Sequence, residues 1–326
     1  MSRRLDSPFG KDAPSIEAAT DACAYCPNLC LHACPVTTAT GRTTEAPWAL
    51  MTLTRWVATG DCAASPDVRR ALGACTACGA CTEACIHHVP VAATLQRARD
   101  LLHRRLGPDA QSRTPAIPAE AVGAPIPAGA SGIPLWLSGD MVAFTSIARA
   151  AASRWQGRSR LLFDDHADLV CVRDLYPMID AAVNASLVLT SLDAMSSSPP
   201  IPAGVVGYLP PCTATARLAM ARTASHGSYV ASLESWLGYA PALLRWDETG
   251  TCCGAAEPFH TQEPAAARAM AERVLQNARD RGIDVLVVLS ASCATHLADV
   301  ATATQSNTRP IRVFWPGGPH QTEALG

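Results

Sequence analysis

The sequence predicts a helical, cysteine-rich domain followed by an α/β domain with a mainly parallel sheet. Three observations support this prediction. The 326 residues are about twice the ~100–200 typical of one domain, and 48% of them are hydrophobic, so two packed domains are expected. The 14 cysteines are concentrated in two blocks. The segment between the blocks, residues 107–132, is rich in proline, lacks an apolar period and is typical of a linker.

Composition excludes several classes of function. The formal net charge is −2 and no basic stripe is visible, so no nucleic-acid partner is expected. No apolar run approaches the ~18–20 residues of a membrane span, and the tail of residues 1–19 lacks the apolar core of a signal peptide. We therefore expect a cytoplasmic protein, with any membrane contact made peripherally through a partner. In that compartment clustered cysteines favour metal binding or catalysis over structural disulfides.

The helical domain is predicted over residues 20–106. The stretch APWALMTLTRWVATG, residues 46–60, is apolar and compatible with a helix. Residues 91–106 carry leucines among strong helix formers, and Gly107-Pro108 supplies a stop signal. A second helix should therefore close this domain.

Short apolar runs alternate with alanine-rich stretches through the rest of the chain, which is the pattern of an α/β domain with a parallel sheet. Asp140 is expected to cap the first long helix. Ligands usually bind at the carboxyl ends of such strands. The predicted helices are residues 141–155, 263–281 and 294–302, and the predicted strands are residues 135–137, 161–163, 186–190, 205–209, 242–246, 284–290 and 311–315.

The α/β part resembles a decayed duplication of residues 133–200 and 201–326. Residues 133–148 align with 206–221, and both are expected to form strand, turn and helix in the same order. ASLVLTSLDA likewise resembles DVLVVLSASC. In each pair only the second copy carries a cysteine, so the first half is expected to have lost the cysteine motif. The alternative is that any two strand–turn–helix units look alike.

The first block contains two runs of four cysteines. The spacing C-x2-C-x2-C-x3-C over residues 75–85 lets one loop wrap a cubane cluster, and the fourth cysteine of such a run binds the other cluster in two-cluster ferredoxins. A similar run spans residues 23–34, and the long separation of the runs favours the helical type of two-cluster domain. Zinc is the alternative, but zinc ribbons use two well-separated pairs. The predicted 4Fe-4S ligands are Cys23, Cys26, Cys30 and Cys85, called the first cysteine set, and Cys34, Cys75, Cys78 and Cys81, called the second cysteine set.

The second block forms the third cysteine set, which is Cys212, Cys252, Cys253 and Cys293. Thirty-nine residues separate Cys212 from Cys252, and 39 separate Cys253 from Cys293. Each element follows a predicted strand, so three loops could converge at one sheet edge. Gly254 fits the tight backbone that adjacent ligating cysteines require. An iron–sulfur centre, a structural zinc and an empty site remain open from spacing alone.

The pattern C-x39-CCG-x39-C, after a helical two-cluster ferredoxin domain, resembles the CCG cysteine-rich domain of heterodisulfide reductase-related proteins. Relatives include iron–sulfur subunits of glycolate oxidase, anaerobic glycerol-3-phosphate dehydrogenase and lactate utilisation systems. The resemblance covers about residues 20–315 and implies a third iron–sulfur centre. In heterodisulfide reductase the motif ends C-x2-C, whereas here His296 replaces that last cysteine and becomes a candidate fifth contact.

No Gly-rich dinucleotide fingerprint follows a strand, so the chain is equipped to pass electrons rather than to transfer hydride. The resemblance implies a non-flavin subunit of an oxidoreductase. It would relay single electrons between a flavin (FAD) dehydrogenase, of the 2-hydroxy-acid or glycerol-3-phosphate type, and a quinone-linked or soluble acceptor. The alternatives are thiol or disulfide catalysis at the third cysteine set, and a zinc-binding interaction protein. The direction of electron flow is left open.

Overall fold

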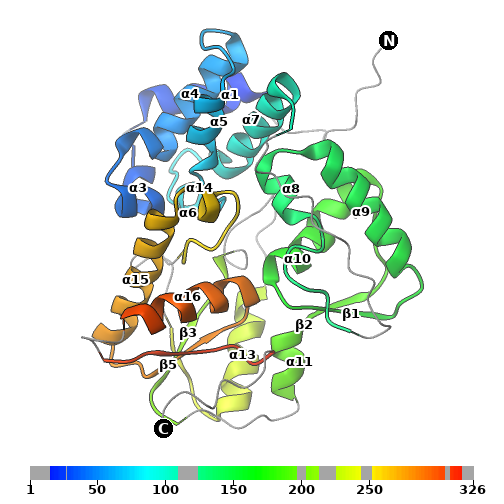
Figure 1. The fold of residues 1–326 in the computed structure, drawn as a ribbon, viewed down its shortest axis with the longest axis vertical. Coiled ribbons are helices and arrows are strands. Elements are labelled where there is room, and N and C mark those ends of the chain that lie inside the picture. The colour runs from blue at the N-terminus through cyan, green and yellow to red at the C-terminus, as the bar shows by residue number, and fades with distance from the viewer. Residues whose placement is uncertain are drawn as a thin grey trace.

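The computed structural model describes residues 15–26, 28–108, 124–196, 203–212, 225–243, 252–304 and 309–317. Figure 1 shows a helical N-terminal region above a region of short parallel sheets and helices. None of the described helices is long and apolar enough to cross a membrane.

The helical region is built from short helices around two longer ones. Both predicted helices are confirmed, as α4 and α7. Proline at the first position begins α3, α4 and α5, where its missing N–H has no helical partner to lose. The helices are α1 (Ile16–Asp21), α2 (Cys30–Ala33), α3 (Pro35–Thr40), α4 (Pro47–Thr59), α5 (Pro66–Gly73), α6 (Ala80–Glu83) and α7 (Val91–Leu106).

The core of this region is an apolar stripe on α7 packed against α4 and α5. Leu95 and Leu102 of α7 are almost fully buried, as are Met51 of α4 and Leu72 of α5. Arg99 lies one turn after Leu95 and is also buried. A charged side chain within the apolar stripe therefore has to find partners inside the protein.

The first part of the α/β region has a two-stranded parallel sheet of β1 (Arg160–Phe163) and β2 (Ser186–Leu189). Ile126 makes a parallel bridge with Phe163 and is fully buried. The end of the segment expected to be a linker thus packs beside the sheet, whereas residues 109–123 lie outside the described residues. The helices here are α8 (Ile133–Ser138), α9 (Met141–Trp155), α10 (His166–Val170) and α11 (Thr190–Ser196).

The second part has a four-stranded sheet in the order β4-β3-β5-β6, and all of its described pairings are parallel. All side chains of β3 and β5 are buried, as expected for parallel strands covered on both faces. The elements are β3 (Val206–Leu209), α13 (Ser225–Leu237), β4 (Ala242–Leu243), α14 (Phe259–Gln262), α15 (Pro264–Asp280), β5 (Val285–Val288), α16 (Ala291–Thr304) and β6 (Arg312–Phe314).

One predicted strand is wrong. Residues 135–137 lie within α8, which begins after Gly132 with Pro134 in its first turn and ends at the left-handed Gly139. A run of three apolar residues does not distinguish a buried strand from a buried helix, and here the flanking Gly and Pro favour the helix. The pairing of residues 133–148 with 206–221 therefore sets a helix against β3. The other pair keeps its order, with β2 and α11 matching β5 and α16.

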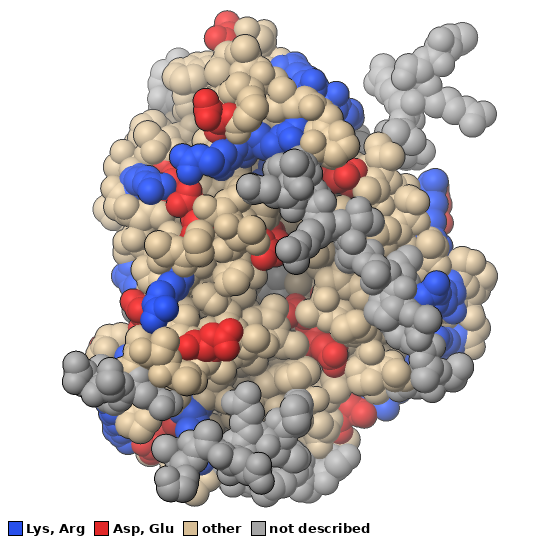
Figure 2. All heavy atoms as spheres, in the orientation of Figure 1, with Lys and Arg blue, Asp and Glu red and all other residues tan. Residues whose placement is uncertain are grey.

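Close contacts join the two regions. Arg42 and Arg70 of the helical region pair with Glu263, which precedes α15, at 3.4 and 2.8 Å. Gly139 approaches α7 so closely that a Cβ there would lie 2.4 Å from the carbonyl carbon of Arg99. Figure 2 shows Asp and Glu side chains around the hollow where the regions meet.

Candidate metal centres

The first cysteine set lines one small cavity. Cys30 begins α2, and Cys85 follows α6. All four side chains are partly exposed. Burial, together with a smaller contribution from the neighbouring thiols, raises the pKa of Cys23 to about 11. The backbone N–H of Val89 points at the Cys85 Sγ, 3.4 Å away, and such donors stabilise a thiolate.

The second cysteine set lies deeper in the helical region. Cys78 and Cys81 are buried. Burial is the main reason that the pKa of Cys81 lies well above its ordinary value, and the other three thiols of the set raise this pKa as well. Burial likewise raises the pKa of Cys34 to about 11. Ala77 has a left-handed backbone, and its N–H donates to the Cys75 Sγ at 3.3 Å. One loop therefore wraps three of these sulfurs.

Arg99 stands beside the second cysteine set. Its guanidinium donates to the carbonyl of Leu72 through Nε and Nη2, at 3.0 and 2.7 Å, and to the carbonyl of Cys75. Nη1 reaches the Leu137 carbonyl of α8 at 2.7 Å. Burial lowers the pKa of Arg99, but a guanidinium remains charged at neutral pH. The cation therefore joins both regions and places positive charge at the second set.

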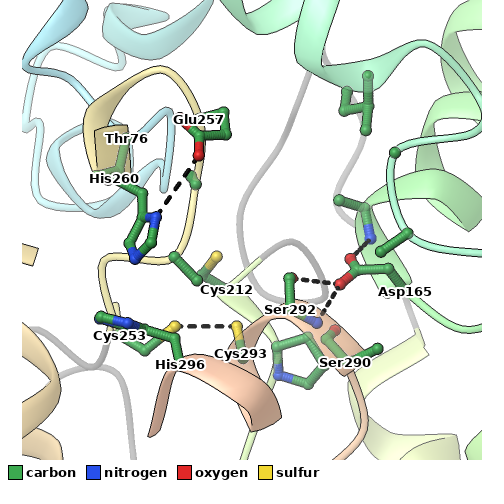
Figure 3. A pocket seen from close by; sticks show the side chains of 18 of the residues that line it. Thr76, Asp165, Cys212, Cys253, Glu257, His260, Ser290, Ser292, Cys293 and His296 are labelled. Carbon is green, nitrogen blue, oxygen red and sulfur yellow. Dashed lines mark hydrogen bonds and ion pairs between the residues drawn. The ribbon is translucent and has the colours of Figure 1, made fainter. Parts of the chain in front are cut away.

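The third cysteine set converges as the spacing predicts. Cys212 follows β3, and Cys293 is the third residue of α16, which follows β5. Cys252 and Cys253 come from the loop before α14 (Figure 3). The sulfurs of Cys253 and Cys293 are 3.0 Å apart, and this contact lowers the pKa of Cys253. All four cysteines line one cavity of about 450 Å³.

Gly254 fixes the path of the Cys252–Cys253 pair. Its φ of +86° is in the left-handed region, and a Cβ there would lie 2.9 Å from both the Cα and the carbonyl oxygen of Ala267. The expected need for glycine after the pair is therefore explained by the close approach of α15.

His296 lies one turn after Cys293 on α16 and lines the same cavity. Its Nε2 is 3.1 Å from the Ala267 carbonyl, and its ring packs edge-to-face on His260 at 4.7 Å. Burial lowers the pKa of His296. The backbone groups of Ala267 and Cys253 both hydrogen-bond the His296 ring, so it is held against the loop of the cysteine pair.

The second and third cysteine sets touch. A hydrogen bond between the Cys78 and Cys252 side chains is the largest cause of the raised pKa of Cys78. The Cys252 Sγ is also 3.6 Å from the Thr76 hydroxyl. Both cysteines belong to one buried cluster with Val36 of α3 and Met270 of α15. The packing of α15 on α3 therefore brings the two sets together.

These donor sets fit iron–sulfur clusters. Apart from the candidate His296, every predicted ligand is a thiol. Three thiols of each ferredoxin-type set share one loop region, and backbone N–H groups point at the sulfurs. Crowded, buried thiols raise one another's pKa values, so holding them as thiolates requires positive charge from a metal. Among the described residues, no group of three or more His, Cys, Asp or Glu side chains is arranged so that it could hold a single metal ion.

Comparison with known proteins gives two family matches. Residues 19–89 match the model of the 4Fe-4S dicluster domain, and residues 206–298 match that of the cysteine-rich CCG domain. The two matches together support an iron–sulfur protein of the heterodisulfide reductase-related type. No curated protein and no solved structure matches it. The iron–sulfur protein thus combines a cluster-binding helical domain with the CCG domain, and the assignment of individual ligands remains a prediction.

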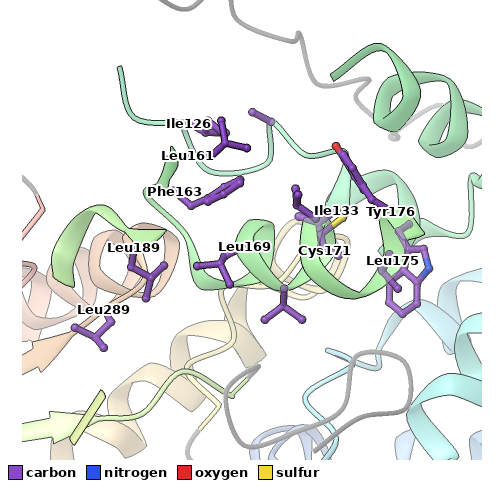
Figure 4. Packing of buried hydrophobic residues seen from close by; sticks show 14 of the residues in the cluster. Ile126, Ile133, Leu161, Phe163, Leu169, Cys171, Leu175, Tyr176, Leu189 and Leu289 are labelled. Carbon is purple, nitrogen blue, oxygen red and sulfur yellow. The ribbon is translucent and has the colours of Figure 1, made fainter. Parts of the chain in front are cut away.

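The remaining two cysteines lie apart from the three sets. Cys171 is fully buried in the core of the first α/β part, where its thiol is 3.8 Å from the Ser131 carbonyl (Figure 4). Cys62 is partly exposed and donates to the neighbouring Ala63 carbonyl. Asp140 caps α9 by accepting from Ala143 N at 2.9 Å, as predicted.

Sequence reasoning missed three polar residues around the sites. Arg99 could have been found as a charge on the apolar stripe of the helix at residues 91–106. Asp165 accepts from Ser292, next to Cys293, and could have been found as a carboxylate directly after a strand. Asp168 had no comparable signal, because its partners, Gly129 and Ser131, lie within the segment expected to be a linker.

Proposed function

We propose that the chain is an iron–sulfur electron-transfer subunit with a 4Fe-4S cluster at each of the first two cysteine sets and a third centre at the CCG cysteines. Iron–sulfur clusters supply one-electron carriers whose potentials depend on hydrogen bonds, charge and exposure. The observation that carries this proposal is the contact between Cys78 and Cys252. A thiol of the second cysteine set therefore lies beside a thiol of the third, within one buried cluster.

The second cysteine set lies between the other two. The first set is partly exposed and is flanked by Leu29 and Ile86, which are 42% and 58% exposed. Cys30 of this set acts on Cys81 of the second, and the second set meets the third at Cys252. This order supports a path in which a protein partner docks at the first set and the CCG cysteines form the far end.

The proposed partner is a flavin dehydrogenase, because flavin divides a two-electron oxidation of a small substrate into single-electron steps. The acceptor is quinone-linked or soluble, and any contact with a membrane is made through a partner. The resemblance to iron–sulfur subunits of hydroxy-acid and glycerol-3-phosphate oxidising systems supports this assignment.

A second candidate is disulfide chemistry at the CCG cysteines. The cavity lined by these four cysteines favours this chemistry, because a protein that only transfers electrons between clusters does not need a substrate pocket. Turnover of a disulfide by the purified chain with a reduced one-electron mediator would support this candidate. Strict dependence on a flavoprotein would count against it.

The proposed path is tested by electron paramagnetic resonance during an anaerobic reductive titration. Because Cys78 contacts Cys252, the signals of the second and third centres should broaden each other when both are paramagnetic. Cys252→Ser should remove the third signal and sharpen the second, whereas Cys62→Ser, outside all sets, should change neither. Signals that are independent of one another in the unchanged protein would contradict the path.

A further inference from the structure

One buried charge accompanies each of the two cysteine sets that touch. Arg99 of α7 lies beside the second set, and Asp165, which directly precedes α10, lies beside the third; each residue is only 4% exposed. Water screens buried charges poorly, so such a charge acts strongly on groups a few ångströms away. The two charges have opposite signs and therefore act in opposite directions on neighbouring centres.

Arg99 has no carboxylate partner among the described residues. Its hydrogen bonds go to backbone carbonyls and, at 3.1 Å, to the side-chain oxygen of Gln96. The adjacent Asp100 pairs with Arg104 instead. The Cys75 side chain does act electrostatically on the guanidinium. The second cysteine set is therefore where the charge of this buried cation is balanced.

Asp165 is held as a carboxylate at the third set. It accepts from Ala167 N at 2.8 Å, from Ser292 N at 3.1 Å and from the Ser292 hydroxyl (Figure 3). Donors to a carboxylate favour its ionised form. Its charge acts on both Cys253 and Cys293. No Lys or Arg is among the described residues that line the cavity here, so no cation of the cavity wall offsets this charge.

The nearby Asp168 does not double this charge in mildly acidic solution. Burial, together with the charge of Asp165, raises the pKa of Asp168 to about 7, so its carboxyl group is mostly protonated at pH 6. The two residues then carry one negative charge between them, and it stays on Asp165, the residue that acts on the CCG cysteines.

We propose that Arg99 and Asp165 separate the reduction potentials of these two centres, so that the second centre accepts an electron before the third. Reduction adds one negative charge to an iron–sulfur centre, and its potential depends on the charges and hydrogen bonds around it. The buried cation stabilises that added charge at the second centre, and the carboxylate destabilises it at the third. The proposal rests on the proposed function for the presence of both centres and goes beyond it in assigning their order of reduction.

This order of reduction lets the chain collect electrons in pairs. The first electron supplied to the two centres reduces the second, and a further electron reduces the third. A reduced third centre therefore has a reduced second centre beside it, so that two electrons are available together. Single electrons from the dehydrogenase partner are in this way paired before they leave the CCG cysteines.

An anaerobic redox titration at pH 6, followed by electron paramagnetic resonance, tests the order. The signal lost in Cys252→Ser belongs to the third centre, and the signal that sharpens in this variant belongs to the second. We expect an electron shared by the two centres to favour the second at least about tenfold, which is 59 mV for one electron. Equal potentials, or earlier reduction of the third centre, would overturn the proposal.

Asp165→Asn removes the carboxylate charge but keeps an oxygen that can cap α10, so the fold should be retained. The third centre should then become at least about tenfold easier to reduce, while the second changes less than about twofold. Asp168→Asn is the matched control and should leave both centres within about twofold at pH 6. Asp165→Asn combined with Asp168→Asn should give the same shift as Asp165→Asn, which excludes a transfer of the charge to Asp168. An unchanged third potential in Asp165→Asn would overturn the proposal.

Arg99→Gln and Arg99→Lys separate charge from packing at the second centre. Both remove the guanidinium and its fork of donors, but only lysine keeps the positive charge. Arg99→Gln should make the second centre at least about tenfold harder to reduce, and Arg99→Lys should restore at least about half of that shift in potential. Equal shifts in both variants would reject the role of this charge. Where Arg99→Gln does not retain its iron, Asp165→Asn decides the proposal by itself.

Iron content separates this proposal from the proposed function. About 12 irons per chain with equal potentials supports three centres and refutes the ordered pair. About 8 irons, with no third signal, refutes the third centre and the ordered pair with it.

Discussion

Arg99 provides the most quantitative prediction, because one buried cation joins α7, α5 and α8 beside the second cysteine set. Arg99→Met removes charged donors from the buried carbonyls of Leu72 and Leu137 and from the partly buried carbonyl of Cys75. A buried acceptor that loses its partner costs about 1–3 kcal/mol, and the loss of the guanidinium's own desolvation cost offsets part of this. We expect a net loss of about 3–5 kcal/mol in the free energy of unfolding.

Thermal unfolding followed by circular dichroism under anaerobic conditions measures this loss. At about 2–4 °C per kcal/mol for domains of this size, Arg99→Met should lower the midpoint by about 10 °C at a fixed scan rate. Arg104→Met is the matched control. Arg104 pairs with Asp100 at 2.7 Å but its side chain is 63% exposed, so a change within about 1 kcal/mol is expected. A midpoint for Arg99→Met within about 2 °C of the unchanged protein would refute the reasoning.

Three further predictions use single changes. Gly254→Ala should lose the iron of the third centre, because its Cβ would meet the Ala267 backbone at 2.9 Å. The control Gly41→Ala, at φ +67° with open space around it, should keep all of its iron. Equal iron content in the two variants would count against the close approach. Burial raises the pKa of Asp168 from 3.8 to about 7, so the folded state holds this proton more tightly than the unfolded state and loses stability as pH rises between these values. Asp168→Asn should therefore gain stability relative to the unchanged protein between pH 5 and pH 8 in thermal unfolding, and a difference independent of pH would argue against this. Cys171→Ser should lower the unfolding midpoint while iron analysis shows no loss, since Cys171 is core; reduced iron would reassign it.

The helical region followed closely from sequence because its signals are local. Residues 91–106 form α7 with the predicted bounds, since strong helix formers end at Gly107-Pro108. The strand predicted at residues 135–137 was wrong because an apolar run of this length is too short to show a period. The flanking Gly and Pro residues make this segment a helix instead. The second pair of aligned segments shares its element order, but descent of the α/β part from two related halves remains a prediction.

Spacing predicted which cysteines come together, but not how the sets lie relative to one another. The contact of Cys252 with Thr76 joins residues 176 positions apart and depends on α15 packing against α3. Neither helix carries a local pattern that specifies its partner. The carboxyl groups that line the cavity at the third cysteine set escaped prediction for the same reason, because they come from α10, α16 and the loop before α14.

The central claim is that one chain carries three iron–sulfur centres, with the third at the CCG cysteines. Iron and acid-labile sulfide analysis of anaerobically purified protein tests it most directly. Three 4Fe-4S centres should give about 12 irons per chain, and Cys253→Ser should keep about 8 with the two ferredoxin-type signals retained. About 8 irons in the unchanged protein, with no loss in Cys253→Ser, would contradict the third centre.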